Sequence, residues 1–369
     1  MQLQKPGLYI HIPFCRSKCS YCDFYSIPSL APLQRFLEGL KKEISLQRDI
    51  FSQPFDTVYI GGGTPTFLKE EHIESILKEV FEKFHIEDGA EITIEANPCD
   101  INIDKAKFLR EIGINRVVLG IQSLMDEILE FLGRRHSADQ ALRAYEVLRK
   151  AGFENIGVDM IYAVPGQSLG EWLNDLKQIV SLSPEHISCY ELTFEKRTRL
   201  WRLFCSGKIA SMDENEKACF FMQTSNFLEN HGYIHYEVSN FAKSELYVSK
   251  HNLKYWLYVP YLGIGPSAHS FDGKKRWWNF ASIKKYCEML RKGILPVEEI
   301  EPLSEEQIRM EKLFLGLRTC YGTELSFCKV SKDVLKLLEK EGLIRITEKR
   351  VIPTKKGFSL ADQLASFLI

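Results

Sequence analysis

Hydrophobic and polar positions alternate in two rhythms along the first half of the chain. Short apolar runs predict strands, and stretches between them, such as 70–84, repeat apolar residues every three or four positions, which predicts helices. Six strands are predicted before about residue 195. They are LYIHI from Leu8, TVYIGG from Thr57, EITIEA from Glu91, RVVLGIQ from Arg116, IGVDMIY from Ile156 and HISCYELT from His186.

Alternating strands and helices are typical of βα units around a parallel sheet. Six units predict an α/β fold, a partial (β/α)6 barrel with its chemistry on the loops after the strands. A cysteine-containing loop follows the first strand, and GGGTPT follows the second. Glu95, Gln122 and Asp159 lie at or near the ends of the next three, so we expect these residues to share one rim.

The second half of the chain has another pattern. A helix is expected near 213–231, and the runs HYEVSNFAK and KHNLKYWLYVPYLGIGPSAHS after it are expected to cover the barrel mouth. The last stretch reads helix, strand, charged turn, strand, helix, which is typical of a small winged-helix-like α+β module. We therefore predict a barrel over 1–235, a capping extension over 236–300 and a C-terminal domain over 301–369.

Composition narrows the function classes. The 369 residues carry 48 basic and 49 acidic side chains, so no global charge favours nucleic acid or an anionic membrane. The run KKRWW at 274–278 is interpreted as a turn into packed tryptophans rather than an RNA-binding patch. No apolar stretch approaches the ~18 residues of a membrane span, and the N-terminus lacks an export signal. We expect a cytoplasmic protein without a nucleic-acid partner or integral membrane segment.

The strongest chemical signal is the run YIHIPFCRSKCSYCDF, in which Cys15, Cys19 and Cys22 can supply three thiolates to one metal centre. Three ligands on a four-iron cluster leave one iron open to a small molecule, whereas a structural zinc site has four closed ligands. Two alternatives remain. The cysteines could bind zinc with a remote fourth ligand such as Cys99, or stay reduced and inert.

The spacing CxxxCxxC followed by an aromatic residue resembles the signature of the radical S-adenosylmethionine (SAM) superfamily, which binds a [4Fe-4S] cluster and SAM. The longer run resembles the family of oxygen-independent coproporphyrinogen III oxidase, and within it the haem chaperone branch. The oxidases read CxxxCxxCxC, whereas this chain has Phe24 at the last position. They also carry a long N-terminal segment, whereas only eight residues precede Tyr9 here. Both departures favour the chaperone branch, and the resemblance covers nearly the whole chain.

The resemblance implies that the glycine run contacts the amino group of SAM through Gly62, Gly63 and Thr64. Glycines allow backbone amides to approach a ligand closely, although an ordinary tight βα turn is the alternative. Acidic groups near apolar strand ends are costly unless they bind something. By resemblance, the ribose and the methionine carboxylate are held by Glu95, Gln122, Arg134 and Asp159, and further cofactor contacts come from Tyr9, Tyr21, Thr193 and His269.

Structural salt bridges are the alternative for these charged residues, and the sequence does not decide between Arg134 and the adjacent Arg135. The family's YGLPGQ reads YAVPGQ here, with Ala163 in place of a glycine. A methyl group is tolerable there unless the backbone angle φ is positive.

A second diagnostic run, HNLKYW, matches the HNxxYW motif associated with haem in the chaperone branch. On a helix His251 and Tyr255 would lie one turn apart on one face, with Trp256 alongside. An imidazole or phenolate can ligate haem iron, and aromatic faces can stack on a porphyrin. The alternative is a hydrogen-bonded histidine within an aromatic cluster.

The resemblance therefore implies a haem chaperone that binds one [4Fe-4S] cluster, SAM and haem and passes haem to an acceptor protein. An electron donor is implied if SAM is cleaved, and no residue is assigned a catalytic role. The competing hypotheses are oxidative decarboxylation of coproporphyrinogen III and a radical SAM reaction on another substrate.

Overall fold

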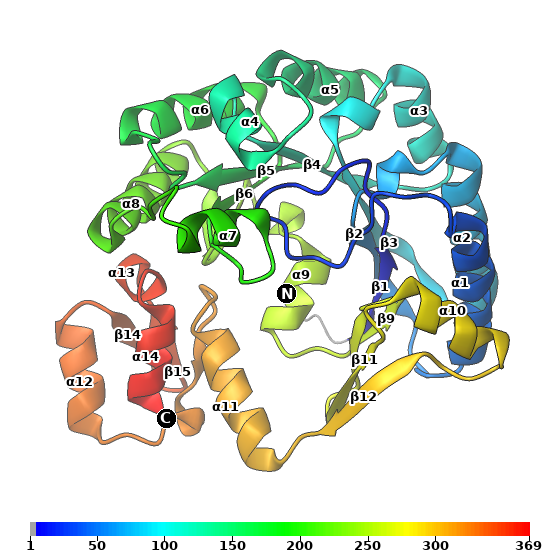
Figure 1. Ribbon diagram of the computed structural model, residues 1–369. Helices are drawn as coiled ribbons and strands as arrows, with labels where there is room; N and C mark the ends of the chain where they lie inside the picture. The colour runs from blue at the N-terminus through cyan, green and yellow to red at the C-terminus, as the bar shows by residue number, and fades with distance from the viewer. Residues whose placement is uncertain (1–4) are drawn as a thin grey trace. The chain divides into compact units, whose positions relative to one another are not determined.

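The computed structural model describes residues 5–369, which form two compact units (Figure 1). Within that range the first unit comprises residues 5–160, Leu192–Ala210 and Val259–Pro302. The second comprises Ile161–Glu191, Ser211–Tyr258 and Leu303–Ile369. Each unit is thus assembled from three separate segments of chain. The three consecutive domains expected from the sequence stay a prediction.

A parallel sheet forms the centre of the first unit. Its strand order is β9-β1-β2-β3-β4-β5, and β10, β11 and β12 extend the β9 edge in antiparallel fashion. The strands are β1 (Gly7–Ile12), β2 (Phe55–Gly62), β3 (Ile86–Ala96), β4 (Arg116–Gln122), β5 (Ile156–Tyr162), β9 (Tyr261–Ile264), β10 (His269–Phe271), β11 (Lys275–Asn279) and β12 (Val297–Pro302). The α/β class with a parallel sheet is confirmed, whereas the strands β9–β12 were not predicted.

The first unit also contains helices, and at least one helix separates each two successive strands from β1 to β5. They are α1 (Leu33–Gln47), α2 (Glu70–Lys83), α3 (Ile103–Glu111), α4 (Asp126–Leu132), α5 (Ala138–Lys150), α7 (Arg199–Cys205) and α10 (Ile283–Arg291), with short 3-10 turns η1 (Pro65–Phe67) and η2 (Pro98–Asp100). Polar groups at the helix starts satisfy free amides: Asn102 caps α3, and Ser137 forms a capping box on α5. Gly133 ends α4 in the left-handed conformation that is common at helix C-termini, with φ 73°.

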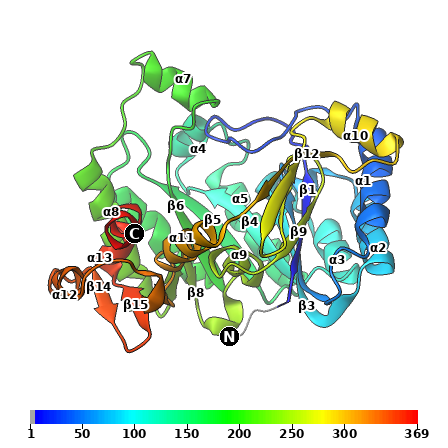
Figure 2. The same ribbon diagram turned by 90° about the horizontal axis from the view of Figure 1, so that it is seen from below.

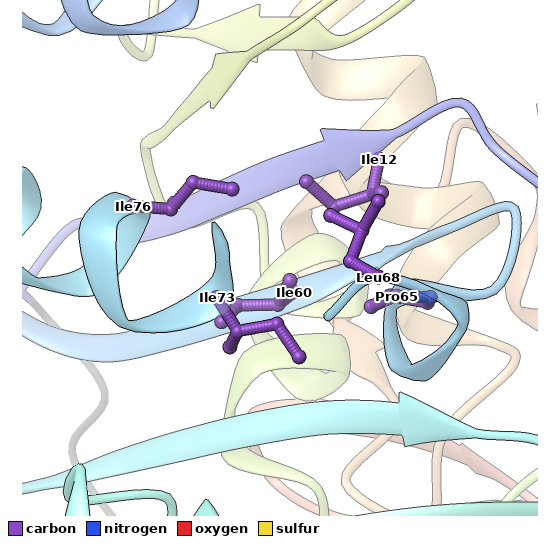
Figure 3. Close-up of a pocket in the computed structure, with 6 residues that line it drawn as sticks. All are labelled: Ile12, Ile60, Pro65, Leu68, Ile73 and Ile76. Atoms are coloured by element: carbon purple, nitrogen blue, oxygen red, sulfur yellow. The ribbon is translucent and has the colours of Figure 1, made fainter. Parts of the chain in front are cut away.

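Apolar packing explains why α2 covers the part of the sheet formed by β1 and β2. Six apolar side chains from β1, β2, the η1 turn and α2 meet there and leave no room for a water molecule (Figure 3). They are Ile12, Ile60, Pro65, Leu68, Ile73 and Ile76. Ile73 and Ile76 belong to the periodic face that predicted this helix, and the contact is core packing rather than a ligand site.

The carboxyl group of Glu43 on α1 is fully buried. It accepts hydrogen bonds from the Tyr286 hydroxyl (2.6 Å), the Asn279 amide (2.6 Å) and the backbone N–H of Gly265 (2.9 Å). Because burial disfavours the charged form, the pKa of Glu43 rises to about 7. The network ties α1 to β11, α10 and the turn after β9.

The second unit contains the antiparallel strands β6 (His186–Glu191), β8 (Asn240–Ala242) and β7 (Ile234–Glu237), in that order. Its helices before the C-terminal part are α6 (Leu169–Leu182), α8 (Glu214–Asn230) and α9 (Lys250–Trp256), with the turn η3 (Glu245–Tyr247). Ala163, where the resemblance implies a glycine, has φ +59°. The residue therefore adopts a left-handed backbone conformation, which costs an L-residue about 1–2 kcal/mol.

The C-terminal part of this unit is a small α+β module, as expected. Three antiparallel strands in the order β13-β15-β14 pack with helices around one apolar core that includes Leu313, Leu338, Val351 and Leu364. The elements are α11 (Glu305–Gly316), β13 (Thr323–Glu324), η4 (Leu325–Phe327), α12 (Lys332–Lys340), β14 (Ile344–Ile346), β15 (Arg350–Pro353), α13 (Lys355–Phe358) and α14 (Ala361–Leu368). Across residues 5–369, no helix is both long and apolar enough to span a bilayer.

Candidate functional site

The three cysteines of the CxxxCxxC run lie on the loop that leaves the carboxyl end of β1 (Figure 1). Backbone hydrogen bonds fix this loop, called here the cysteine loop, at Cys15 and at Ser20. Cys15 N–H donates to the Ile27 carbonyl at 3.1 Å, and Ser20 N–H donates to the Leu132 carbonyl at the end of α4 at 3.0 Å. A Cβ at Gly133 would lie 2.9 Å from Ser20 Oγ, so a glycine is needed where α4 meets the loop.

Polar groups of neighbouring elements contact two of the thiols. Thr64 Oγ1 lies 3.6 Å from Cys15 Sγ, and Arg134 Nη1 lies 3.4 Å from Cys19 Sγ. Burial is the main cause that raises the pKa of Cys15 and that of Cys22, and neighbouring thiols of the loop add to it; the pKa of Cys22 reaches about 11. These thiols are therefore protonated at neutral pH unless a metal centre displaces the protons.

Among residues 5–369, no three His, Cys, Asp or Glu side chains lie close enough together to hold a single metal ion. In a four-iron cluster each thiolate binds a different iron, so the three cysteines do not have to converge on one ion. The donor set of three partly buried sulfur atoms on one loop fits that group.

The glycine run after β2 lies directly against the start of the cysteine loop. Gly63 N–H donates to the Ile12 carbonyl and Thr64 N–H to the Phe14 carbonyl, both at 2.8 Å. A Cβ at Gly63 would lie 2.6 Å from the Phe14 carbonyl oxygen. Gly62 has φ +108°, and a Cβ there would lie 2.6 Å from the His11 ring. Close approach therefore requires both glycines, and the positive φ is a second requirement for Gly62.

Glu95, near the end of β3, is held against the glycine run. Its carboxyl oxygens accept hydrogen bonds from the Tyr59 hydroxyl at 2.9 Å and from Gly62 N–H at 3.1 Å. Burial, together with the nearby Asp159 carboxylate, raises the pKa of Glu95 to about 7. Two acids thus face the same region from β3 and β5, where a ligand with hydroxyl groups or a positive charge would stabilise them.

Gln122 closes β4 in an unusual conformation. Its φ is +74°, and the pairing with β5 shifts register between Gly120 and Gln122. A Cβ at Gly120 would lie 2.9 Å from Gln122 Nε2 and 3.3 Å from Arg134 Nη2, so this glycine leaves space for both side chains. Backbone strain of this kind at a strand end is typical of functional sites.

Arg134, rather than the exposed Arg135, is the arginine that contacts the cysteine loop. Its Nη2 donates to the Gly120 carbonyl at 2.7 Å. Its buried Nε has no hydrogen-bond partner within the described part of the chain. A guanidinium with an unused buried donor fits a carboxylate ligand, because arginine binds carboxylates through paired N–H groups.

Tyr9, Tyr21 and His269 lie around the same region. Tyr21 is close enough to Arg134 and Asp159 for their charges to act on it, although burial is the main cause of its raised pKa. The Tyr9 hydroxyl hydrogen-bonds His11 Nδ1 at 3.0 Å. His269 is exposed and stacks on Trp278, with ring centroids 5.5 Å apart.

His11 and Tyr59 contact this site but were not predicted. The His11 ring hydrogen-bonds Tyr9 and, at 2.8 Å, the Tyr25 carbonyl, and burial lowers its pKa to about 4, so it is neutral at pH 7. Strand alternation could have indicated His11, because Tyr9 and His11 lie on the same face of β1 while Leu8 and Ile10 face the helices.

Thr193 and the HNLKYW run are the remaining predicted residues. Thr193 is exposed just beyond the end of β6. The HNLKYW run forms α9 in the second unit. There His251 is buried, with Nε2 2.8 Å from the Tyr255 hydroxyl, and Arg318 lies over the Trp256 ring at 5.8 Å.

Comparison with known proteins places this geometry in a family. Residues 9–179 match the model of the Radical SAM superfamily. The chain is 34% identical to the heme chaperone HemW of Bacillus subtilis (strain 168), covering 96% of this chain and 97% of that protein. It is 33% identical to HemW of Lactococcus lactis subsp. lactis (strain IL1403), with 98% and 97% covered.

A solved structure resembles the chain over nearly its whole length. This is the coproporphyrinogen III oxidase HemN of Escherichia coli, described as a radical SAM enzyme, with a TM-score of 0.84 and 25% identity over 99% of this chain and 90% of that one. The likeness supports the fold reached from the strands and helices above. With this fold, the radical SAM match and full-length similarity above 30% to several HemW proteins, the chain belongs to the HemW family of radical SAM proteins.

Proposed function

We propose that this protein is a haem chaperone, which binds haem and passes it to an acceptor protein. The observation that carries the proposal is the end-to-end identity of 33–34% with proteins named heme chaperone HemW. Phe24 adds support, because it stands where the oxidases of the wider family have a further cysteine, and the residue is 68% exposed.

The cofactor site of the proposed chaperone is the rim formed by the ends of β1 to β5. Cys15, Cys19 and Cys22 would ligate three irons of a [4Fe-4S] cluster, which supplies an open iron for SAM and a low-potential electron when reduced. Arg134 supplies donors for the methionine carboxylate of SAM. Glu95 and Asp159 supply acceptors for its ribose hydroxyls, and the Gly62–Gly63 backbone lies beside the cysteine loop without a Cβ in the way.

The haem contact of the proposed chaperone is the exposed side of α9. Tyr255 and Trp256 are half-buried, so part of each aromatic face is open to a flat ligand. His251 is buried and hydrogen-bonded to Tyr255, so it orients that phenol, and its Nε2 can bind haem iron only after this bond breaks. We assign stacking on haem to the side chains of Tyr255 and Trp256. The test below also includes His251, which could ligate the haem iron.

Haem titration of variants tests this proposal. Replacing His251, Tyr255 and Trp256 together by alanine should weaken haem binding and leave the iron–sulfur absorption unchanged, because the proposed cluster ligands lie in the other unit. His231→Ala with Tyr247→Ala is the matched control, since it removes a histidine and a tyrosine of the same unit outside α9. Full haem affinity in the triple variant would mean that the haem site lies outside α9. Loss of haem binding in the control alone would indicate a site near His231.

Oxidative decarboxylation of coproporphyrinogen III is the second candidate, favoured by the TM-score of 0.84 to HemN. It predicts protoporphyrinogen IX at multiple turnovers when the reconstituted protein receives SAM, a reductant and coproporphyrinogen III. The chaperone proposal predicts none. We infer a cytoplasmic location for the chaperone, where free thiols and an oxygen-sensitive cluster persist.

A further inference from the structure

We propose that the face around the cysteine loop docks an acidic one-electron carrier protein of the flavin or iron–sulfur class. The inference rests on the proposed cluster, which such a carrier would reduce. It is carried by a concentration of basic and aromatic side chains on a segment joined to the cysteine loop.

The segment is 194–205, called here the basic arm, which includes α7. From 192 to 210 the chain has five basic residues and one acidic residue, although the whole protein has a formal net charge of −1. Four of the basic residues lie within seven positions and all four are exposed: Lys196, Arg197, Arg199 and Arg202. Their charges are therefore a local feature of this face and not a consequence of overall composition.

Two contacts join the basic arm to the cysteine loop. Leu200 N–H donates to the Ser20 carbonyl at 3.0 Å, and Arg197 forms an ion pair with Asp23 at 3.2 Å. Both views place α7 beside the loop that follows β1 (Figures 1 and 2). The arm therefore lies next to the three thiols.

The cysteine loop adds charge and apolar surface of its own. Arg16 and Lys18 are exposed between the cysteines, and Lys18 Nζ donates to the Phe24 carbonyl at 3.1 Å. Phe24 is one of the most exposed large apolar side chains among the described residues, at 68%. An exposed phenylalanine beside exposed cations suits a protein interface better than open solvent.

Aromatic side chains on the arm complete the surface. Phe194 and Phe204 stack with ring centroids 5.1 Å apart, and Trp201 lies 5.9 Å from Phe204. Arginine and aromatic residues are the types that supply most binding energy at protein interfaces. Complementary charge also steers encounter, which favours an acidic partner over a neutral or basic one.

The chemistry assigned to this surface is a single electron transfer. The reduced carrier loses one electron, the cluster gains one, and no bond forms or breaks in that step. A carrier seated on the arm and Phe24 would place its redox group on the side of the protein where the three cysteines lie.

Binding of a purified acidic flavodoxin to the anaerobically reconstituted protein, measured by isothermal titration calorimetry, tests the proposal. The variant Lys196→Glu, Arg199→Glu, Arg202→Glu keeps the Arg197–Asp23 pair. Its control is Lys332→Glu, Lys336→Glu, Lys340→Glu on α12, which reverses the same number of exposed charges. At about 50 mM salt the arm variant should bind at least about tenfold more weakly than the control, and the gap should shrink at about 500 mM.

A second readout separates docking from cluster damage. Dithionite, a small reductant that needs no docking surface, should reduce the cluster equally in wild type and both variants, whereas reduction by the flavodoxin should slow in the arm variant alone. Equal flavodoxin binding in both variants would overturn the proposal, and so would tight binding of single-stranded RNA with none of the carrier. Absence of a dithionite-reducible cluster before any carrier is added would instead overturn the proposed cofactor.

Discussion

Replacing Gly62 by alanine tests the close packing between the glycine run and β1. Two costs are expected. At φ +108° an L-residue is strained by about 1–3 kcal/mol. The new methyl group would also lie 2.6 Å from the His11 ring, and overpacking of this kind costs about 1–3 kcal/mol.

The His11 ring cannot move aside freely, because it is hydrogen-bonded to the Tyr9 hydroxyl at 3.0 Å and to the Tyr25 carbonyl at 2.8 Å. Each lost bond would cost about 1 kcal/mol. We therefore expect Gly62→Ala to lower the free energy of unfolding of the first unit by about 2–6 kcal/mol.

Gly113→Ala is the matched control. Gly113 has φ +96°, close to that of Gly62, but a Cβ there has nothing within 4 Å. It should carry the backbone strain alone, so the difference between the two variants measures the clash with His11. Hydrogen exchange of peptides from β1 and β2 under increasing urea reads the first unit separately from the second.

The double variant His11→Ala, Gly62→Ala completes a thermodynamic cycle. Removing the imidazole should recover about 1–3 kcal/mol of the Gly62→Ala cost. Equal destabilisation by Gly62→Ala and Gly113→Ala, together with no coupling to His11, would refute the packing described for this site.

Three further predictions concern the cluster, SAM and pH. Reconstituted protein should hold about four irons, and the variant with Cys15, Cys19 and Cys22 all replaced by alanine should hold none; four irons in that variant would remove the assignment. Asp159→Ala should weaken SAM binding by about 1–3 kcal/mol in calorimetry, as expected for a lost charged hydrogen bond, and unchanged affinity would make Asp159 structural. The pKa of Glu43 is raised from 4.5 to about 7, so its contribution to the free energy of unfolding is complete below pH 4.5. That contribution falls by about 3 kcal/mol as the pH rises through 7. The pH dependence of urea unfolding should therefore be shallower in Glu43→Gln.

The sequence predicted the part of the fold that is encoded by local periodicity. All six strands up to β6 lie where apolar runs predicted them, and α2 uses the expected face through Ile73 and Ile76. The strands β9 to β12 were missed, because their pairing is non-local and their short segments carry polar and aromatic residues instead of a clear period of two.

For the candidate site, the sequence could indicate residue types but not their contacts. The motif spacing led to the cysteines and glycines, whereas the partners of Glu95 could not be read, because Tyr59 comes from a neighbouring strand 36 positions away. The structure also supplies the angle on which the Ala163 expectation depended, since φ +59° is the positive value at which a methyl group is strained.

Haem titration of the anaerobically reconstituted protein, followed by gel filtration and Soret absorbance, tests the central claim most directly. The chaperone account predicts that about one haem per chain stays bound, that Tyr255→Ala with Trp256→Ala lowers this fraction, and that no protoporphyrinogen IX forms when coproporphyrinogen III, SAM and a reductant are supplied to the same preparation. No retained haem, together with multiple turnovers of coproporphyrinogen III, would contradict it.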